Sequence, residues 1–368
     1  MPLRRPADVG SFAAVLGLAL AASSCDVELT EEAYVETSEA ELAWVQGTRV
    51  EVMNVRGDLE IVERPGSVVL IEARKRVVAP SDEEERELAG EIRVDAVQEE
   101  GTLRLEVTYP DRVLTSSRVV IVGREARRPR ASVNLKISLP AGAPIRMETR
   151  SGDIRSERYT GSLDFSSSSG DAYLDDWRGD CLITTRSGDA SILRIDGSLR
   201  MSSASGDLSG EEVTKDLEFN ATSGDLQLSR VGGKLSASTA SGDIEIDLVG
   251  GGLEVRTTSG DVAINGARAV GWLETSGGDV DLELREPEGV FELRTASGDV
   301  TLRLEPPYTG RLEASTASGT IDVVLPLTVE QANRNRLVGR LGAGPQALRL
   351  STASGDIHVF EGDGGGEL

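Results

Sequence analysis

The sequence predicts an all-β protein whose body is a single-chain parallel β-solenoid with 18-residue coils. Three observations predict this fold: a Ser-Gly-Asp motif recurs at a fixed step, apolar residues alternate between the motifs, and large side chains are scarce. Only 4% of the 368 residues are aromatic, while 41 are glycine. Such a composition suits a thin repetitive core better than a thick globular one.

The glycine of the motif recurs every 18 residues from Gly152 to Gly278. It continues with looser spacing at Gly298, Gly319 and Gly355. Repetition at a fixed period indicates a repeat architecture, here of about eleven coils. A second glycine follows nine residues after the first in most early coils, so each coil divides into two halves, each a short strand and a turn.

Alternating apolar residues predict strands with one buried face. Leu253, Val255 and Thr257 precede one motif. Val262 and Ile264 follow it. A period of two is typical of a half-buried strand. The four residues between Thr257 and Val262 have glycine third, which predicts a type II turn with a glycine of positive φ. Successive coils are expected to stack in parallel about 4.8 Å apart.

Two further columns of the repeat carry an expectation each. A column of hydroxyl residues beside the turn is expected to hydrogen-bond the turn amides along the stack: Thr149, Ser167, Thr185, Ser203, Thr239, Thr257, Thr275, Thr295, Thr316 and Thr352. Cys181 occupies a column that holds leucine in the sister coils, which predicts a small buried hydrophobic residue.

The chain divides into five predicted segments: a signal peptide over 1–24, a lipidated cysteine with an acidic tether over 25–45, an irregular β-rich N-terminal cap over 46–140, the solenoid over 141–360, and a disordered tail over 361–368. In the cap, Arg56-Gly57-Asp58 indicates a degenerate first coil. Strands are expected at 68–76, 92–97, 103–108 and 133–139, and Ser81 is expected to cap a short helix near 82–90. Residues 325–345 break the period, which predicts a loop or a small cap insertion.

The N-terminus has the features of an export signal. Arg4 and Arg5 precede an apolar run of eleven residues, 12–22, which is too short to span a bilayer as a helix. The following Ala22-Ser23-Ser24-Cys25 resembles the lipobox of bacterial lipoproteins, with Ala22 where that pattern usually has leucine. The resemblance implies acylation of Cys25 and a membrane partner through the lipid; ordinary signal cleavage nearby is the alternative. We therefore predict an exported, lipid-anchored protein, periplasmic or on the cell surface.

The net charge of −23 limits the possible partners. It repels nucleic acid and anionic lipid headgroups, so nucleic-acid binding is excluded. It suits cations or an extracellular setting.

The aspartate of the repeat is the clearest candidate site. The column contains Asp153, Asp171, Asp189, Asp207, Asp225, Asp243, Asp261, Asp279, Asp299 and Asp356. Stacked carboxylates repel one another, so the ladder either binds Ca²⁺ or accepts hydrogen bonds from backbone or serine groups. With a single aspartate per coil at one corner, calcium would have few ligands, and we expect the hydrogen-bonded ladder. Ca²⁺ is the only cofactor that these residues suggest.

Catalytic features are sparse in this sequence. His358 is the only histidine, and neither a cysteine nor a second histidine accompanies it to build a metal or nucleophile site. The strict step between 152 and 260 leaves no long loops that could form a cleft. We expect that the protein is not an enzyme.

The Thr-x-Ser-Gly-Asp-Val/Ile repeats, preceded by Asn54–Ile61 (Asn-Val-Arg-Gly-Asp-Leu-Glu-Ile), resemble the DUF4097 putative-adhesin family of bacterial β-strand repeat proteins over about residues 50–360. The resemblance implies a noncatalytic envelope protein, an adhesin or surface scaffold, whose partners are envelope proteins, surface proteins or glycans. A periplasmic envelope-stress component is the alternative. A polysaccharide-active β-helix enzyme is a more distant one.

Overall fold

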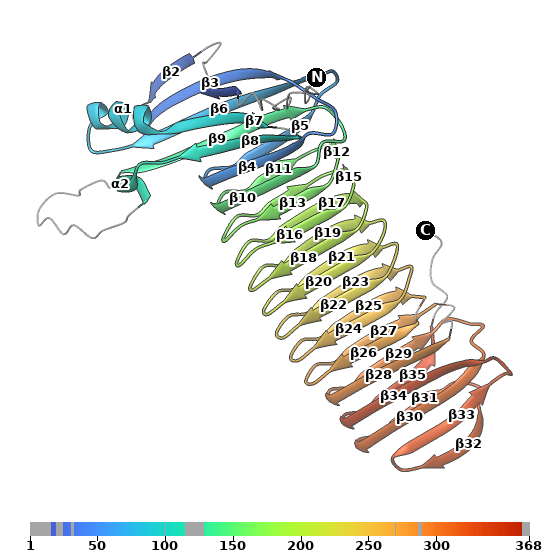
Figure 1. Cartoon of the computed structure of the whole chain (residues 1–368). Coiled ribbons are helices and arrows are strands. Elements are labelled where there is room, and N and C mark those ends of the chain that lie inside the picture. The colour runs from blue at the N-terminus through green and yellow to red at the C-terminus, as the bar shows by residue number, and fades with distance from the viewer. Residues whose placement is uncertain are drawn as a thin grey trace, which may run out of the picture.

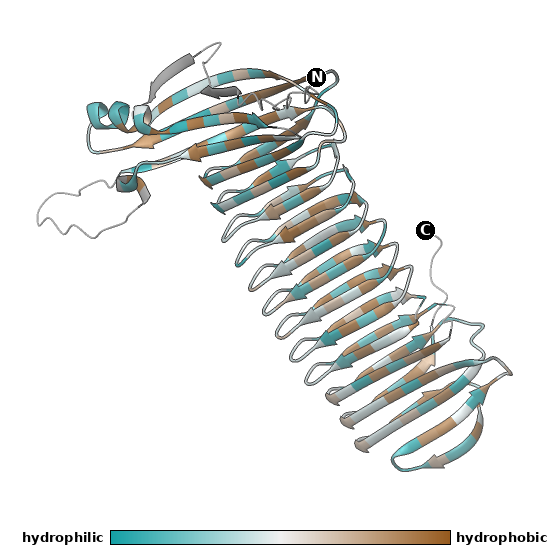
Figure 2. Cartoon of the chain, viewed as in Figure 1, coloured by the Kyte–Doolittle hydropathy of each residue, from teal (hydrophilic) through white to brown (hydrophobic). Residues whose placement is uncertain are grey.

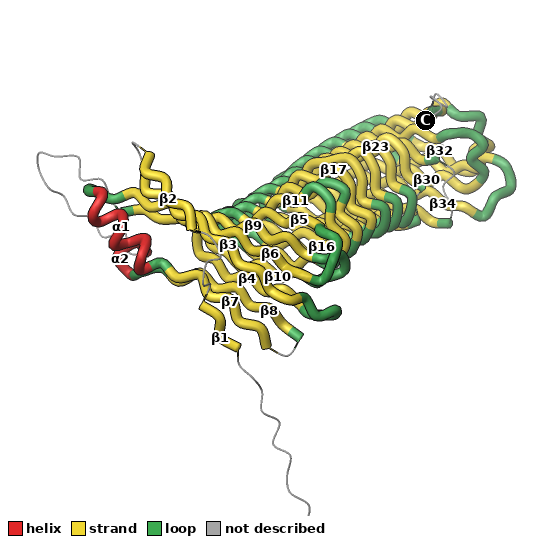
Figure 3. Tube along the Cα trace, turned by 90° about the horizontal axis from the view of Figure 1, so that it is seen from above, coloured by secondary structure: helices red, strands yellow, loops and turns green. Residues whose placement is uncertain are grey.

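The computed structural model describes residues 16–19, 25–30, 33–99, 101–114, 129–268, 270–285 and 289–362. Two sheets run along an elongated rod, a 17-stranded sheet A and an 18-stranded sheet B. Each coil contributes one strand or strand pair to each sheet, and the loops lie along the two edges (Figures 1 and 3). The predicted all-β solenoid is confirmed.

In spatial order from the N-terminal end, sheet A consists of β1 (Leu16–Ala19), β7 (Arg93–Glu99), β8 (Thr102–Thr108), β4 (Arg49–Arg56), β10 (Ile145–Ser151), β13 (Leu163–Ser166), β16 (Cys181–Thr184), β18 (Leu199–Ser203), β20 (Leu217–Ala221), β22 (Leu235–Thr239), β24 (Leu253–Thr257), β26 (Gly271–Thr275), β28 (Val290–Ser297), β34 (Gln346–Ser354), β30 (Gly310–Ser318), β33 (Arg336–Leu341) and β32 (Thr328–Asn333).

Sheet B consists of β2 (Cys25–Thr30), β3 (Ala33–Ala43), β6 (Val68–Val78), β9 (Arg130–Leu139), β5 (Leu59–Glu63), β11 (Ile154–Ser156) with β12 (Tyr159–Thr160), β14 (Ala172–Leu174) with β15 (Trp177–Arg178), β17 (Ala190–Asp196), β19 (Leu208–Val213), β21 (Leu226–Val231), β23 (Ile244–Val249), β25 (Val262–Ala267), β27 (Val280–Leu284), β29 (Val300–Leu304), β35 (Ile357–Glu361) and β31 (Ile321–Val324).

Alternation along the strands builds a single core between the sheets. In β24, Leu253, Val255 and Thr257 are buried, whereas Glu254 and Arg256 point outward. The same alternation of hydropathy recurs from coil to coil (Figure 2). Apolar burial is the main favourable term in folding, and here it forms one continuous cluster along the rod.

The motif glycines are required for a different reason from the one predicted. None of the glycines from Gly152 to Gly278 in the 18-residue series has φ in the left-handed region, so the type II turn prediction is wrong. A Cβ on Gly242 would instead lie well under 3.0 Å from the carbonyl oxygen of Gly224 in the preceding coil. Glycine is needed because successive turns stack backbone on backbone.

The coils at the C-terminal end are not stacked in sequence order. β34 pairs in parallel with β28 on one side and with β30 on the other. β35 likewise lies between β29 and β31. The last coil of the sequence is therefore inserted between the two coils before it, and the coil of β30 and β31 ends the rod.

The N-terminal end shows a similar exchange of order. The coil of β4 and β5 pairs with β10 and β11 on one side and with β8 and β9 on the other. The degenerate first coil at Arg56-Gly57-Asp58 is thus a true coil, and the solenoid extends into the segment assigned to the cap. The predicted cap strands are confirmed as β6 to β9.

Antiparallel strands and a helix complete the N-terminal cap. β6 runs antiparallel to β9, and β3 runs antiparallel to β6. The helix α1 (Asp82–Glu91) begins after Ser81, whose side chain accepts a hydrogen bond from the Glu84 N–H, as predicted. A short helix, α2 (Asp111–Leu114), follows β8.

The acidic tether predicted over 25–45 is wrong for the residues that the structure describes. β2 pairs with β3, and β3 pairs with β6 along Tyr34–Ala43. Ala33, Tyr34 and Val35 are buried. An acidic segment can form such a strand because its acidic side chains occupy positions that are only partly covered or exposed, while the backbone groups pair with the sheet.

Two sequence predictions, the signal peptide and the C-terminal tail, concern residues that are partly outside the description. Within the signal peptide 1–24, only Leu16–Ala19 are described, as β1. In the tail, 363–368 are outside, while Glu361 ends β35. Residues 325–345 contain the hairpin of β32 and β33, which is the cap insertion. Across the described ranges, no helix is long and apolar enough to cross a membrane.

Candidate functional site: the aspartate ladder

The motif aspartates form one continuous hydrogen-bonded ladder along an edge of the rod. In each pair of neighbouring coils, the Oδ1 atom of one aspartate accepts the backbone N–H of the next at 2.8–2.9 Å, from Asp153 and Asp171 through to Asp299 and Asp356. The carboxylates therefore satisfy turn amides of the following coil, and the predicted hydrogen-bonded arrangement is confirmed. All ten aspartates of the predicted column, from Asp153 to Asp299 and Asp356, belong to it.

The ladder begins and ends on residues that are not part of the predicted set. Asn134 of β9 accepts from the Asp58 N–H at 3.2 Å, and Asp58 accepts from the Asp153 N–H at 3.2 Å. At the far end, Asp356 accepts from the Thr320 N–H at 2.7 Å. Thr320 ends the rod, so no later turn amide among the described residues requires a carboxylate there.

The exceptional Ser318-Gly319-Thr320 motif is explained by this topology. In sequence it lies before the Asp356 coil, but in space it lies after it. The Arg56-Gly57-Asp58 motif could identify Asp58 as a ladder residue from the sequence. No motif could identify Asn134, because it lies outside any glycine motif.

Hydroxyl side chains support the turns beside the ladder. Thr185 accepts from the Gly188 N–H at 2.8 Å, and Ser167 accepts from the Gly170 N–H at 2.7 Å. These bonds confirm the predicted role of the hydroxyl column for those coils, although they lie within one coil. Thr239 and Thr316 instead donate to the glycine carbonyl of the neighbouring coil, at 3.3 and 3.1 Å. These members of the column support the turns in two ways. The prediction is wrong for the buried hydroxyl oxygens of five other members, which have no hydrogen-bond partner among the described residues: Thr149, Ser203, Thr257, Thr275 and Thr295.

The two ends of the ladder have opposite electrostatic environments. Partial burial raises the pKa of Asp153, as do the charges of Asp58 and Asp171, whereas the hydrogen bond from the Asp171 N–H lowers it. At the other end, hydrogen bonds from the backbone N–H and the hydroxyl of Thr320 hold the pKa of Asp356 below its ordinary value. The carboxylate form is stabilised at the C-terminal end and disfavoured near the N-terminal end.

These pKa shifts predict opposite pH dependences for two variants. Asp356 stabilises the fold above the pKa of the unfolded chain, and this contribution is lost as pH falls through the lower folded pKa. Asp153 has a raised folded pKa, so its contribution falls as pH rises through the range between the unfolded and folded values. Urea titrations from about pH 3 to 6 measure the free energy of unfolding of wild type and of each variant. The difference between wild type and Asp356→Asn should rise with pH. The difference between wild type and Asp153→Asn should fall with pH. Equal slopes for the two variants would contradict the assignment.

The calcium alternative finds no preformed cluster in the described part of the chain, where no group of three or more His, Cys, Asp or Glu side chains could hold a metal ion. The ladder instead presents one carboxylate per coil, with Oδ1 already engaged by an amide. Six to eight oxygen ligands are typical of Ca²⁺. Calcium binding is the alternative to the hydrogen-bonded ladder, and the ladder variants described in the Discussion test it.

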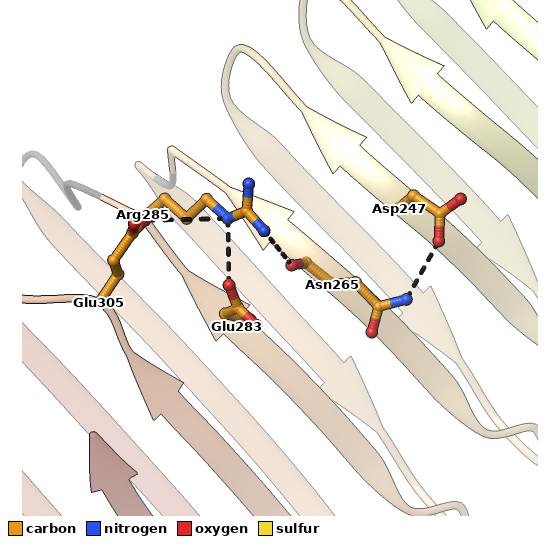
Figure 4. A network of polar contacts seen from close by, with 5 residues as sticks. All are labelled: Asp247, Asn265, Glu283, Arg285 and Glu305. Atoms are coloured by element: carbon orange, nitrogen blue, oxygen red, sulfur yellow. Dashed lines mark hydrogen bonds and ion pairs between the residues drawn. The ribbon is translucent and has the colours of Figure 1, made fainter. Parts of the chain in front are cut away.

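The outer faces of the sheets carry polar contacts between coils. On sheet B, Asn265 donates to Asp247 at 3.1 Å, and Arg285 donates to Glu283 at 3.0 Å and to the Asn265 carbonyl at 3.5 Å (Figure 4). Arg285 also lies 3.8 Å from Glu305. On sheet A, Arg200 pairs with Glu218, and Arg256 pairs with Glu274. Solvent-exposed pairs contribute about 0–1 kcal/mol each, so these faces are charged but largely self-paired.

The remaining predicted residues are placed as follows. Cys181 is buried, as predicted, and burial raises the pKa of its thiol. His358 lies on β35, partly exposed, opposite Thr301 and Asp322 of the neighbouring strands. Cys25 is the first residue of β2, but the surroundings of its side chain lie outside the description.

Comparison with known proteins supports the repeat assignment. Residues 194–360 match the model of the family described as Toastrack DUF4097. The predicted family resemblance is thereby confirmed for that part of the chain. No curated protein matches the chain.

Several solved structures resemble the chain at low sequence identity. A putative lipid binding protein from Parabacteroides distasonis is 15% identical, with a TM-score of 0.31 over 88% of this chain and 97% of that one. A putative cell adhesion protein from Clostridium sporogenes is 10% identical, with a TM-score of 0.20 over 88% and 98%. A putative adhesin from Parabacteroides merdae is 10% identical, with a TM-score of 0.25 over 88% and 96%. At these scores the likenesses carry no inference about function.

Proposed function

We propose, from the premise that residues 194–360 are a Toastrack DUF4097 segment, that this protein is a noncatalytic cell-envelope protein. It presents a rigid acidic rod for adhesion or surface scaffolding. The anchor is the acylated Cys25, as the lipobox-like Ala22-Ser23-Ser24-Cys25 implies. The protein is exported and remains attached to a membrane through this lipid.

The observation that carries the proposal is the placement of the two ends. β2, which begins at the predicted anchor, and β3 lie in the cap at one end of the rod (Figure 1). The coil of β30 and β31 lies at the opposite end. A protein held by Cys25 would therefore project its far end away from the membrane.

The lateral surfaces suit a spacer better than a catalyst. Coils from β13 to β26 stack in register with short turns, and the outer side chains pair with one another across coils. Catalytic sites generally require a concave pocket with convergent polar groups. Among the described residues, the acidic edge consists instead of carboxylates already bound to backbone amides.

Surface accessibility on intact cells tests the proposal. An epitope placed after Leu368 should be lost on treatment of intact cells with a protease, because the rod is expected outside. A lysed sample defines complete loss, and a Cys25→Ala variant should release the protein from the membrane fraction. Protection until lysis would overturn surface presentation and favour the periplasmic envelope-stress role. Membrane retention of Cys25→Ala would overturn the lipid anchor.

A further inference from the structure

The two sheets end at different places at the far end of the rod. Among the described strands, sheet B ends at β31, which pairs with β35 and with no other strand. Sheet A continues past β30 with β33 and then β32 (Figure 1). Neighbouring strands lie about 4.8 Å apart, so sheet A overhangs sheet B by two strands, or about 10 Å.

The underside of this overhang is apolar. Val329 lies opposite Gly339, which in turn lies opposite Leu312, a fully buried core residue. Directly opposed residues of antiparallel strands point to the same face. Val329 therefore faces the core side of sheet A, and yet its side chain is 54% exposed.

A second pair of residues shows the same arrangement. Ala332 lies opposite Leu337, and Leu337 lies opposite the buried Ala314. Ala332 is exposed and Leu337 is only partly buried. The side chain of Leu327, which precedes β32, lies against Gly339 and covers the underside in part. No described strand of sheet B lies beyond β31 to cover Val329 and Ala332.

The outward face of the overhang is, in contrast, charged and internally paired. Arg340 pairs with Glu330 at 3.2 Å, and Arg311 approaches the same carboxylate at 3.6 Å. Arg336 pairs with Glu313. The outer face also holds Val338, which lies opposite Glu313 and is buried, so the exposed apolar side chains of the overhang lie on its underside. The underside is therefore the surface available for docking.

Strand β31 offers an open edge beside this underside. The Ile357 N–H donates to the Thr320 carbonyl, so alternation directs the backbone groups of Ile321 and Val323 away from β35. The side chains of Ile321 and Val323 are only partly buried, whereas Val300, in the same column of an inner coil, is fully buried. An unpaired edge of this kind is a template for another strand.

We propose that a second copy of this chain occupies this end. The two-fold axis lies at the end of the rod, midway between the two sheets and parallel to the strands. Rotation about this axis places sheet B of the second copy in line with sheet A of the first, so that the one sheet continues into the other. The longer sheet A of each copy would then meet the shorter sheet B of the other copy. The two extra strands of sheet A would fill the space where sheet B of the other copy ends two strands earlier. The interface is isologous, as in most dimers.

Strand directions are compatible with this joint. β32 runs parallel to β30, because β33 is antiparallel to both. β30 and β31 run in opposite directions as successive halves of one coil. Rotation about the strand direction preserves these directions, so β32 of one copy pairs antiparallel with β31 of the other. Val329, Ala332 and Leu337 of the two copies then pack against each other as a closed core.

The joint makes a rod of double length with the two caps at its extremities. The pairing itself is independent of the lipid anchor. If Cys25 is anchored as proposed above, the dimer would bridge two membrane surfaces, a consequence that rests on the proposed function.

Sedimentation velocity tests the joint on the full chain carrying Cys25→Ser, so that acyl groups cannot drive association. We expect a dimer at about 100 μM and a maximum dimension in small-angle scattering of about twice that of the monomer. Val329→Glu should give a monomer, since it places a charge in the closed core. Val324→Glu is the matched control, because Val324 is 66% exposed on the outer face of β31, and it should remain dimeric.

Three outcomes would overturn the proposal: a monomeric parent at that concentration, a dimer that survives Val329→Glu, or a dimer whose maximum dimension matches a side-by-side pair. Circular dichroism melting distinguishes lost pairing from lost folding, because an exposed position such as Val329 should tolerate glutamate in the monomer. The anchor plays no part in these measurements, so failure here leaves the surface-accessibility test unaffected.

Discussion

Gly278→Ala should destabilise the rod by about 3 kcal/mol or more, near the upper end of single-residue effects. The added Cβ would lie well under 3.0 Å from the Gly260 carbonyl oxygen, which belongs to the backbone of the preceding coil. Backbone cannot rotate away as a flexible side chain can, so the two coils must separate locally. Separation would also weaken the bond from the Asp279 N–H to Asp261. Chemical denaturation followed by circular dichroism measures the effect.

The adjacent Gly277 provides the matched control. A Cβ there would have no neighbour closer than the Thr258 carbonyl oxygen at 3.7 Å, and most sister coils carry serine at this position. Gly277→Ala should therefore be neutral or stabilising by about 0.5 kcal/mol, because alanine reduces the entropy of the unfolded chain. Similar losses in the two variants would show that a general intolerance of alanine, and not coil stacking, explains the first result.

Replacing Asp207, Asp225 and Asp243 together with alanine should lower the free energy of unfolding by about 3 kcal/mol. Each carboxylate accepts one backbone N–H of the next coil, at 2.8–2.9 Å. A net hydrogen bond contributes about 1 kcal/mol where water can partly replace it. Denaturant titration of the triple variant beside wild type checks the value.

A triple asparagine variant separates hydrogen bonding from charge. Asparagine keeps an acceptor oxygen and removes the repulsion between stacked carboxylates, so its loss should stay below about 1 kcal/mol. Repeating both titrations with Ca²⁺ and with a chelator tests the calcium alternative. Under the hydrogen-bonded ladder, neither addition changes the wild type. A chelator-sensitive wild type, together with an asparagine variant as weak as the alanine variant, would establish calcium as the stabilising element.

Local periodicity predicted most of the solenoid. The 18-residue step, the buried column that includes Leu253 and the aspartate ladder follow from side chains that repeat at the same place in each coil. Stacking of identical coils converts a pattern along the chain into a column in space, so the ladder residues could be identified without coordinates.

The glycine prediction failed because two demands select the same residue. A turn with positive φ and a close approach of two backbones both require glycine. The sequence around Gly242 does not distinguish them. Only the distance from Gly242 to the carbonyl of Gly224 in the neighbouring coil does.

The sequence by itself determined the class of fold, the repeat and the chemistry of the ladder, because these depend on the local order of residues. The tertiary structure alone decided the order of the terminal coils, the capping strand β3 and the overhang of β32. Those features depend on which edge a distant segment pairs with, and backbone hydrogen bonds carry little sequence preference. For the same reason, Thr320 breaks the aspartate repeat in the sequence, whereas in space it is the last residue of the ladder and donates its N–H to Asp356.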